Sequence, residues 1–196
     1  MILSDEGIKK ALASGAIEID PAPVADQYTT SAVDVHLGDN SQFRMWDHAR
    51  LQVPGAAVHL DLSAQSYQLT ARAYMLSAPL QLDGSLVLPP YSVEPRVWLC
   101  MTRERLHLKR DSQIAARVEG RSSFARLGLM VHLTAPTIHS DFNAPITLEC
   151  INHGPFYLKL VPHRTRICQF IFELLDSPPS MPIATGFQHQ TSPAGS

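Results

Sequence analysis

Short apolar runs of about strand length recur along most of the chain, separated by Pro, Gly, Asn and Asp. Runs bounded in this way are typical of β-strands. They occupy residues 32–37, 58–62, 85–88, 97–101 and 146–151. In residues 156–160, three apolar positions alternate with Tyr157 and Lys159, which predicts a strand with one buried face; residues 167–175 are almost continuously apolar, which predicts a strand buried on both faces. The pattern predicts a mainly β fold, a sandwich or a barrel.

One segment near the N-terminus departs from this pattern and predicts a short amphipathic helix within residues 4–17. Ser4 can act as its N-cap, acidic residues fill the first turn, and Gly15 can end it. The apolar residues Ile8, Ala11 and Leu12 would share one face. This is the only full helix that the pattern predicts.

Length and composition fit one domain. The chain has 196 residues, of which 45% are hydrophobic and 17% charged, enough for a single core of ordinary size. From residue 177 onward Pro, Ser, Gly, Gln and Thr dominate, so we expect a folded domain over residues 1–176 and a mobile tail over residues 177–196 that can close over a ligand. No apolar run approaches the roughly 18 residues of a membrane span, and we expect a cytoplasmic location without membrane contact.

Charge and cysteine content exclude some function classes. A net charge of −2 gives no general attraction to nucleic acid, and the one local cluster of cations, near Arg117, Arg121 and Arg126, suits a single triphosphate better than a duplex. The three cysteines stand singly in apolar stretches, at Cys100, Cys150 and Cys168. Without paired spacing they are predicted to be reduced core residues and not metal ligands.

The run from Gly120 to Gly128 carries the first candidate chemistry. It combines Arg121 and Arg126 with the hydroxyls of Ser122 and Ser123 at the start of a possible short helical turn. Arginine forks, hydroxyls and the unpaired N–H groups of a helix start can together share the charge of a polyphosphate. The alternative is a solvated basic turn with ordinary capping. It is not a P-loop, because the required Gly and Lys spacing is absent.

Glu149 is the second candidate, because it lies inside the apolar strand predicted over residues 146–151. A buried, unpaired carboxylate is costly, so Glu149 should either face solvent or occupy a polar cavity with a partner such as Arg126. It is either a surface or ion-paired structural residue or a proton shuttle.

Taken together, several segments resemble the dCTP deaminase family, which belongs to the wider superfamily of dUTPases. The similar segments are residues 1–5, 31–38, 118–132, 134–149 and 167–169. The run Gly-Arg-Ser-Ser-x-Ala-Arg-Leu-Gly-Leu is highly specific to that family. The resemblance implies a distorted β-barrel or jelly roll with a short N-terminal helix, assembled as a homotrimer with active sites at subunit interfaces.

The resemblance also implies roles for the candidate catalytic residues. Glu149 would be the general acid and base, Ser122 and the main-chain carbonyl of Ala135 would hold the attacking water, and Arg126 would orient Glu149 and stabilise charge on the ring. The signature of zinc-dependent deaminases, His-x-Glu with Pro-Cys-x-x-Cys, is missing, so no metal-bound hydroxide is expected.

The remaining implied contacts concern nucleotide binding. The phosphates would be received by Arg121, Ser122 and Ser123, the base edge would be read by the backbone at Thr147 and Leu148, and the triphosphate or sugar would be approached by Gln169 and Gln190. Mg²⁺ would be held mainly by the phosphates, without a protein ligand. His139 stands where the family has an aspartate that contacts the deoxyribose, and the tail around Gln190 lacks the family's lysine. His132 follows the family pattern and is expected near the site.

Four functions remain open at this point. The first is hydrolytic deamination of dCTP to dUTP with release of ammonia. The second is a dUTPase, or a bifunctional enzyme that carries dCTP through to dUMP and pyrophosphate. The third is a catalytically silent nucleotide-binding regulator, and the fourth is action on a modified cytosine nucleotide. Inhibition by dTTP is left open.

Overall fold

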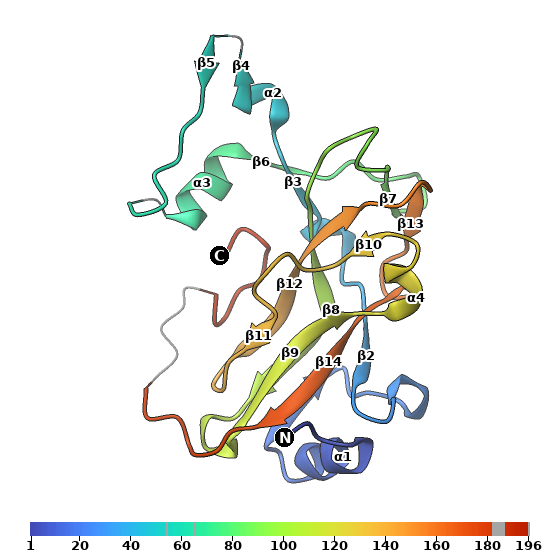
Figure 1. The fold of residues 1–196 in the computed structure, drawn as a ribbon, viewed down its shortest axis with the longest axis vertical. Helices are drawn as coiled ribbons and strands as arrows, with labels where there is room; N and C mark the ends of the chain where they lie inside the picture. The colour runs from blue at the N-terminus through green and yellow to red at the C-terminus, as the bar shows by residue number, and fades with distance from the viewer. Residues whose placement is uncertain (54, 65, 182–186, 196) are drawn as a thin grey trace.

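Two antiparallel sheets form most of the regular structure in the computed structural model, which describes residues 1–53, 55–64, 66–181 and 187–195 (Figure 1). The six-stranded sheet has the order β10 (Leu129–Met130), β12 (Asn143–Asn152), β8 (Trp98–Leu108), β3 (Arg44–Trp46) and β6 (Met75–Ser77), with β1 (Ile17–Asp20) paired to β8. The four-stranded sheet has the order β11 (Thr137–Ile138), β9 (Ile114–Gly120), β14 (Arg166–Leu174) and β2 (Val33–His36). The predicted mainly β fold is confirmed; both sheets are open, and no closed barrel occurs within the described ranges.

Smaller elements connect and flank these sheets. Two short strand pairs lie outside them, β7 (Leu86–Leu88) with β13 (Leu158–Leu160) and β4 (Gln52–Val53) with β5 (Ala56–Ala57). The helices are α1 (Asp5–Ala13), α2 (His48–Leu51), α3 (Tyr67–Tyr74) and α4 (Ser122–Ala125), and the 3₁₀ turns are η1 (Ala25–Gln27), η2 (Asn40–Gln42) and η3 (Arg110–Ser112). No helix in the described part of the chain is long and apolar enough to cross a membrane.

One hydrophobic core joins side chains from both sheets. Phe170 and Phe172 of β14, Leu106 of β8 and Leu148 of β12 belong to it, and all four are fully buried. Every second residue of β12 faces this core, so the residues between them point to the other side of the sheet. Truncating one such phenylalanine to alanine would cost about 3–5 kcal/mol of stability. The core therefore fixes which face of β12 is left for a site.

The predicted N-terminal helix is confirmed as α1. The Ser4 hydroxyl accepts a hydrogen bond from the Gly7 amide at 3.3 Å, which is the N-cap contact that the sequence predicts. Gly15 adopts a left-handed φ of +71°, and the chain then enters β1, so the helix ends at Ala13. Ile8 and Ala11 bury the apolar face against the sheets.

The segment between β3 and β6 differs from its prediction in two respects. The strand expected over residues 58–62 is wrong: these residues have no regular structure, and Leu62 is 88% exposed. A short apolar run alone does not make a strand, because a strand also needs a hydrogen-bonded neighbour. The sequence analysis also missed α3, in which Thr70 and Ala71 are buried but the N-cap Ser66 makes no side-chain cap contact.

Two late strands need smaller corrections. β14 is a strand as predicted, yet only one of its faces is fully buried, since Gln169 and Ile171 are half-buried. β13 spans Leu158–Leu160 only, and Phe156 is exposed instead of joining the apolar face.

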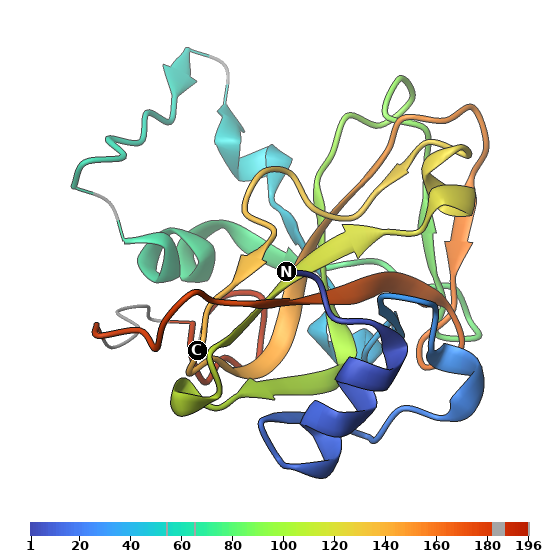
Figure 2. The ribbon, with the colours of Figure 1, turned by 60° about the horizontal axis from the view of Figure 1, so that its bottom comes forward.

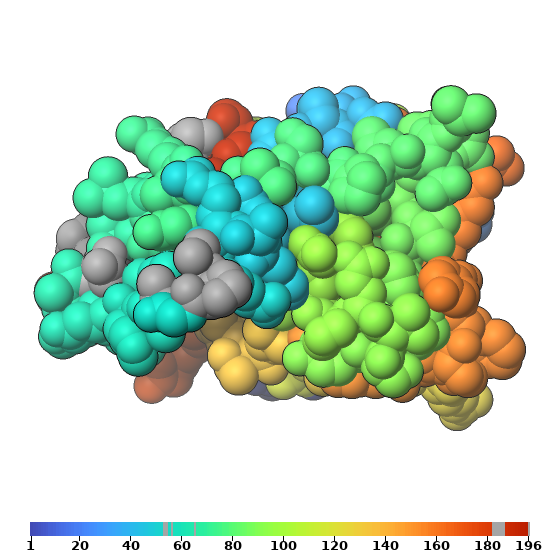
Figure 3. Space-filling model, turned by 90° about the horizontal axis from the view of Figure 1, so that it is seen from above, coloured from blue at the N-terminus to red at the C-terminus, as the bar shows by residue number. Residues whose placement is uncertain are grey.

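The excursion that contains α2, β4, β5 and α3 projects from the sheets (Figures 1 and 2). Seen from above, its atoms form a lobe at one side of the molecule (Figure 3). α3 lies at the base of this lobe, where it faces the C-terminal segment, and its first residue, Tyr67, forms a hydrogen bond to Pro193.

Candidate active site

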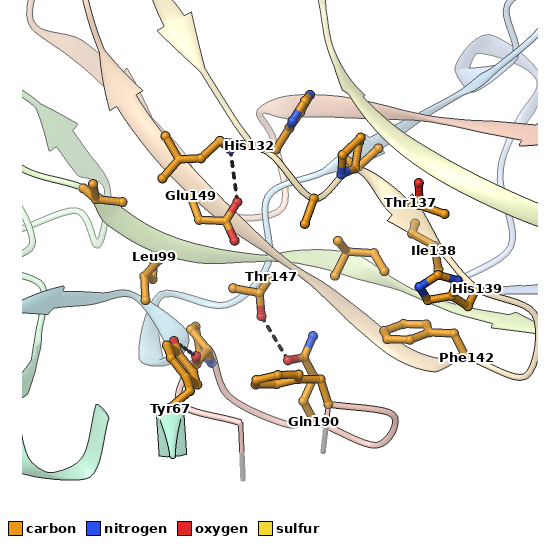
Figure 4. Close-up of a pocket in the computed structure, with 18 of the residues that line it drawn as sticks. Tyr67, Leu99, His132, Thr137, Ile138, His139, Phe142, Thr147, Glu149 and Gln190 are labelled. Carbon is orange, nitrogen blue, oxygen red and sulfur yellow. Dashed lines mark hydrogen bonds between the residues drawn. The ribbon is translucent and has the colours of Figure 1, made fainter. Parts of the chain in front are cut away.

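A cavity of about 530 Å³ lies over the outer face of β12 (Figure 4). Most of its wall is apolar, contributed by Val97, Leu99, Val118, Leu133, Ile138, Phe142 and Ile146. Trp46, Tyr67 and Phe187 add further aromatic rings to it, and its polar side chains include His132, Thr137, His139, Thr147, Glu149 and Gln190. A mostly apolar concave site with a few convergent polar groups is the usual form of a small-molecule site.

Glu149 reaches this cavity because of the alternation along β12. Leu148 and Cys150 are fully buried on the core side, so Thr147 and Glu149 point to the opposite face. The Glu149 carboxylate accepts a hydrogen bond from the Leu133 amide at 3.4 Å. Among the described residues that line the cavity, it is the one carboxylate. The anomaly seen in the sequence is therefore a half-buried acid facing a cavity.

Thr147 and Gln190 form a second polar group, on the wall of the same cavity. The Thr147 hydroxyl donates to the side-chain oxygen of Gln190 at 3.1 Å, and the Gln190 amide nitrogen donates to the carbonyl of Pro145 at 2.9 Å. Gln190 is only 6% exposed. Both residues were predicted site residues, and the fold brings them together although they lie far apart in the sequence.

Ala135 and His139, two further predicted residues, flank the short strand β11, one before it and one after it. Both line the cavity and both are exposed. His132 lines it as well, as the sequence predicted. Its Nε2 lies 3.6 Å from a Glu119 carboxylate oxygen, while its Nδ1 is buried without a hydrogen-bond partner in the described part of the structure.

Tyr67 was not among the residues that the sequence singled out. The Tyr67 ring lies edge-on to Trp46, with 6.5 Å between centroids, and 5.5 Å from the Phe187 ring. Burial, together with the negative charge of Glu149, raises the pKa of Tyr67 to about 12. The only sequence signal was an aromatic side chain in a segment without a predicted element, which is too common to single out a site.

The basic turn, residues 121–126, lies outside the wall of the Glu149 cavity. Ser122, Ser123 and Arg126 are exposed and do not contribute to the wall of the Glu149 cavity in the described ranges. The short helical turn predicted here is confirmed as α4, which begins at Ser122. None of the ion pairs found in the described residues joins Arg126 to Glu149.

Arg121 and Gln169 belong to a separate group around the buried carboxylate of Asp34. An Arg121 guanidinium nitrogen lies 3.2 Å from one Asp34 oxygen, and the Gln169 amide donates to the other at 2.7 Å. The guanidinium also stacks over the Phe124 ring. Arg121 lines a second cavity, of about 480 Å³, with three other cations, Lys159, Arg164 and Arg166.

The cysteines lie in the core, as predicted. Cys100, Cys150 and Cys168 are free and fully buried. A hydrogen bond with Cys150 and burial raise the pKa of Cys100, and burial raises that of Cys168, so neither is poised as a thiolate. Within the described ranges, no group of three His, Cys, Asp or Glu residues is arranged to hold a metal ion.

Comparison with known proteins adds an independent finding. Residues 2–175 match the family model described as dCTP deaminase-like. A protein named dCTP deaminase from Rhodospirillum rubrum is 38% identical over 184 residues, which cover 94% of this chain and 88% of that protein. A protein named dCTP deaminase, dUMP-forming, from Methanosphaera stadtmanae is 37% identical over 181 residues, which cover 92% of this chain and 83% of that protein.

A solved structure supports the fold. The crystal structure of 2′-deoxycytidine 5′-triphosphate deaminase from Agrobacterium tumefaciens superposes with a TM-score of 0.60 at 19% identity. The match covers 88% of this chain and 48% of that one, so the chain spans about half the length of that protein. The family model matches most of the sequence, and the named relatives are similar to it over more than nine tenths of its length. The chain therefore belongs to the dCTP deaminase-like family.

Proposed function

We propose that the protein is a hydrolytic deaminase that converts dCTP and water into dUTP and ammonia. The observation that carries this proposal is Glu149, a half-buried carboxylate in a mostly apolar cavity of a chain in the dCTP deaminase-like family. Relatives at 35–38% identity carry the name dCTP deaminase, which supports the same substrate.

In the proposed reaction, the Glu149 carboxylate takes one proton from a water molecule as the water oxygen bonds to C4 of the cytosine ring. That proton passes to ring N3, where it stays in the uracil product. The proton of the new C4 hydroxyl then moves through Glu149 to the amino group, which leaves as ammonia while the C4 carbonyl forms. Glu149 ends as the carboxylate that it was at the start, so it acts as general base and then as general acid.

The surroundings of Glu149 fit this role. The amide of Leu133 holds one carboxylate oxygen, which orients the group, and the apolar wall excludes bulk water from the reacting atoms. The carbonyl of Ala135 would hold the attacking water, and the backbone at Thr147 and Leu148 would read the edge of the base. His139 would contact the deoxyribose in place of the family's aspartate.

We further propose that the basic turn completes the cavity of a neighbouring copy in a homotrimer. Ser122, Ser123 and Arg126 are exposed, and in a single chain no described residue of the turn lines the cavity of Glu149. Arg121, Ser122 and Ser123 would take the phosphates there, with Gln169 behind them, while Arg126 and Ser122 would approach Glu149 and the water. Two half-sites on different faces are what an interfacial active site requires.

Mg²⁺ would enter with the nucleotide. The basic turn offers guanidinium groups and hydroxyls, which bind phosphate oxygens and leave the metal to the phosphates themselves. We propose that no zinc takes part in the chemistry, because the cysteines that a zinc-dependent deaminase would use as ligands are here buried in the core with raised pKa values at Cys100 and Cys168.

A second candidate is a bifunctional enzyme that also hydrolyses dUTP to dUMP and pyrophosphate. It is favoured by the relatives at 33–37% identity that are named dCTP deaminase, dUMP-forming. Because dTTP has the same sugar and phosphates as dUTP, we propose it as an inhibitor of either form.

The deciding experiment incubates the protein with dCTP and Mg²⁺, separates the nucleotides by anion exchange, and assays ammonia and pyrophosphate. Ammonia with dUTP and no pyrophosphate supports the deaminase; dUMP with equimolar pyrophosphate supports the bifunctional enzyme. Tight dCTP binding without any product would replace both with a nucleotide-binding regulator. 5-Methyl-dCTP in parallel tests for a modified base.

A further inference from the structure

The first residue of α3, Tyr67, makes a direct contact with the C-terminal segment, residues 187–195. Its hydroxyl donates a hydrogen bond to the carbonyl of Pro193 at 2.6 Å (Figure 4). Its ring packs edge-on to Phe187, 5.5 Å between centroids. Tyr67 therefore touches this segment near both of its ends.

Gln190 lies between these two contacts. Its side chain is held by Thr147 and by the carbonyl of Pro145, on the strand that carries Glu149. A segment that is fixed at Phe187 and at Pro193 has little freedom in between, so fixing its ends lowers the entropy cost of placing Gln190 at the cavity wall. Gln42 and Gln188 add two side-chain contacts to the same segment, donating to the carbonyls of Thr191 and Asp141 respectively.

The state of the Tyr67 hydroxyl suits a permanent contact. Its pKa is raised to about 12 by burial and by the charge of Glu149, so the hydroxyl keeps its proton and remains a donor throughout the neutral range. Trp46 makes a second edge contact with the ring, at right angles to it, which restricts the direction of the ring.

We propose that Tyr67 is a positioning residue that holds the C-terminal segment against the cavity and so presents Gln190 to the nucleotide. This inference rests on the proposed function for one point, namely that the ligand of the cavity is a deoxynucleotide. It gives the excursion between β3 and β6 a role, because that excursion brings α3 beside a cavity formed by other parts of the chain.

The first test needs no substrate. In Tyr67→Phe the ring stays and the hydroxyl is lost, so hydrogen–deuterium exchange in residues 187–195 should become faster by about two- to ten-fold, the usual effect of one lost hydrogen bond. Tyr74→Phe is the matched control: it is the same change at the other end of α3, where the ring packs on Arg50. Unchanged exchange in Tyr67→Phe would overturn the proposal.

The second test uses turnover. Tyr67→Phe should raise the KM for dCTP about two- to ten-fold with a much smaller effect on kcat, because the hydroxyl acts on binding through Gln190. In a Gln190→Ala background, Tyr67→Phe should add little, since the residue that it positions is gone. Fully additive effects on KM would contradict the proposal. If no variant and no wild-type protein deaminates dCTP, the proposed function fails, while the exchange experiment still decides the role of Tyr67.

Discussion

The cavity of Glu149 and the basic turn at residues 121–126 are built in opposite ways. The cavity has a mostly apolar wall around one half-buried carboxylate, whereas the turn exposes its serines and Arg126 on a short helix. Proton transfer gains from a site that excludes water, because electrostatic interactions strengthen there. Phosphate binding needs several accessible donors, which an exposed helix start supplies.

Proton transfer and phosphate binding, the two halves of the proposed chemistry, therefore place conflicting demands on one surface. A pocket dry enough for Glu149 cannot also expose four or more donors to a triphosphate without hydrating its own wall. In the proposed trimer this conflict would be resolved, because the two halves lie on separate faces and would meet only when copies of the chain assemble.

Replacing Glu149 by glutamine should abolish deamination. The amide keeps the shape of the side chain but cannot accept and return protons, so kcat should fall by about 10³-fold or more, within the range for a lost general acid and base. Ammonia release under saturating dCTP measures the effect. Glu173→Gln, on β14 and outside the cavity wall, is the matched control. Sustained turnover by a folded Glu149→Gln protein would remove the proposed mechanism.

Replacing Arg126 by alanine should lower kcat/KM by about 10²-fold, as expected when one charged group that stabilises the transition state is removed. The loss should be smaller than that for Glu149→Gln, because other groups of the turn remain. Arg103→Ala removes an exposed arginine from β8 and serves as the control. Equal losses in both variants would show a general effect of charge, and the basic turn would then lose its assigned role.

The sequence predicted the half of this arrangement that depends on local pattern. Glu149 was recognisable because a carboxylate interrupts an apolar strand, and alternation then determines that it faces away from the core. α1 was predictable because its cap and its apolar face lie within a few residues of one another. The basic turn was recognisable from its composition and from its specific motif.

The other half depends on contacts between distant segments. Tyr67 and Phe187 meet only because α3 and the C-terminal segment are brought to the same edge of the cavity, and no local pattern encodes that meeting. The wrong strand prediction at residues 58–62 has the same cause, since the segment is an apolar run of strand length but no neighbouring strand pairs with it in the described residues. The sequence also offered Arg126 as a partner for Glu149. No ion pair in the described part of one chain joins the two residues, and a local pattern cannot show that.

Mixed assemblies test directly whether the two halves come from different copies. Glu149→Gln and Arg126→Ala chains, co-expressed with different tags and purified through both, should show activity well above that of either variant alone. Because purification through both tags removes the homotrimers, about one in three interfacial sites of a mixed trimer would carry both native residues. Light scattering should give the mass of a trimer. If a confirmed mixed trimer shows no more activity than the two variants alone, each chain holds a complete site.

The smallest expected effect concerns His139, which belongs to the cavity and not to the basic turn. His139→Asp replaces an imidazole by a carboxylate at the position where the family contacts the deoxyribose. A charge-assisted hydrogen bond to the 3′-hydroxyl should lower the KM for dCTP about two- to five-fold. The control is 2′,3′-dideoxy-CTP, which lacks that hydroxyl and should show no gain. A sugar contact made from the cavity is independent of the phosphate contacts, so His139→Asp should lower the KM for dCTP by the same factor in the Arg126→Ala background. If the KM is not lowered there, the two regions do not divide the nucleotide between them as proposed.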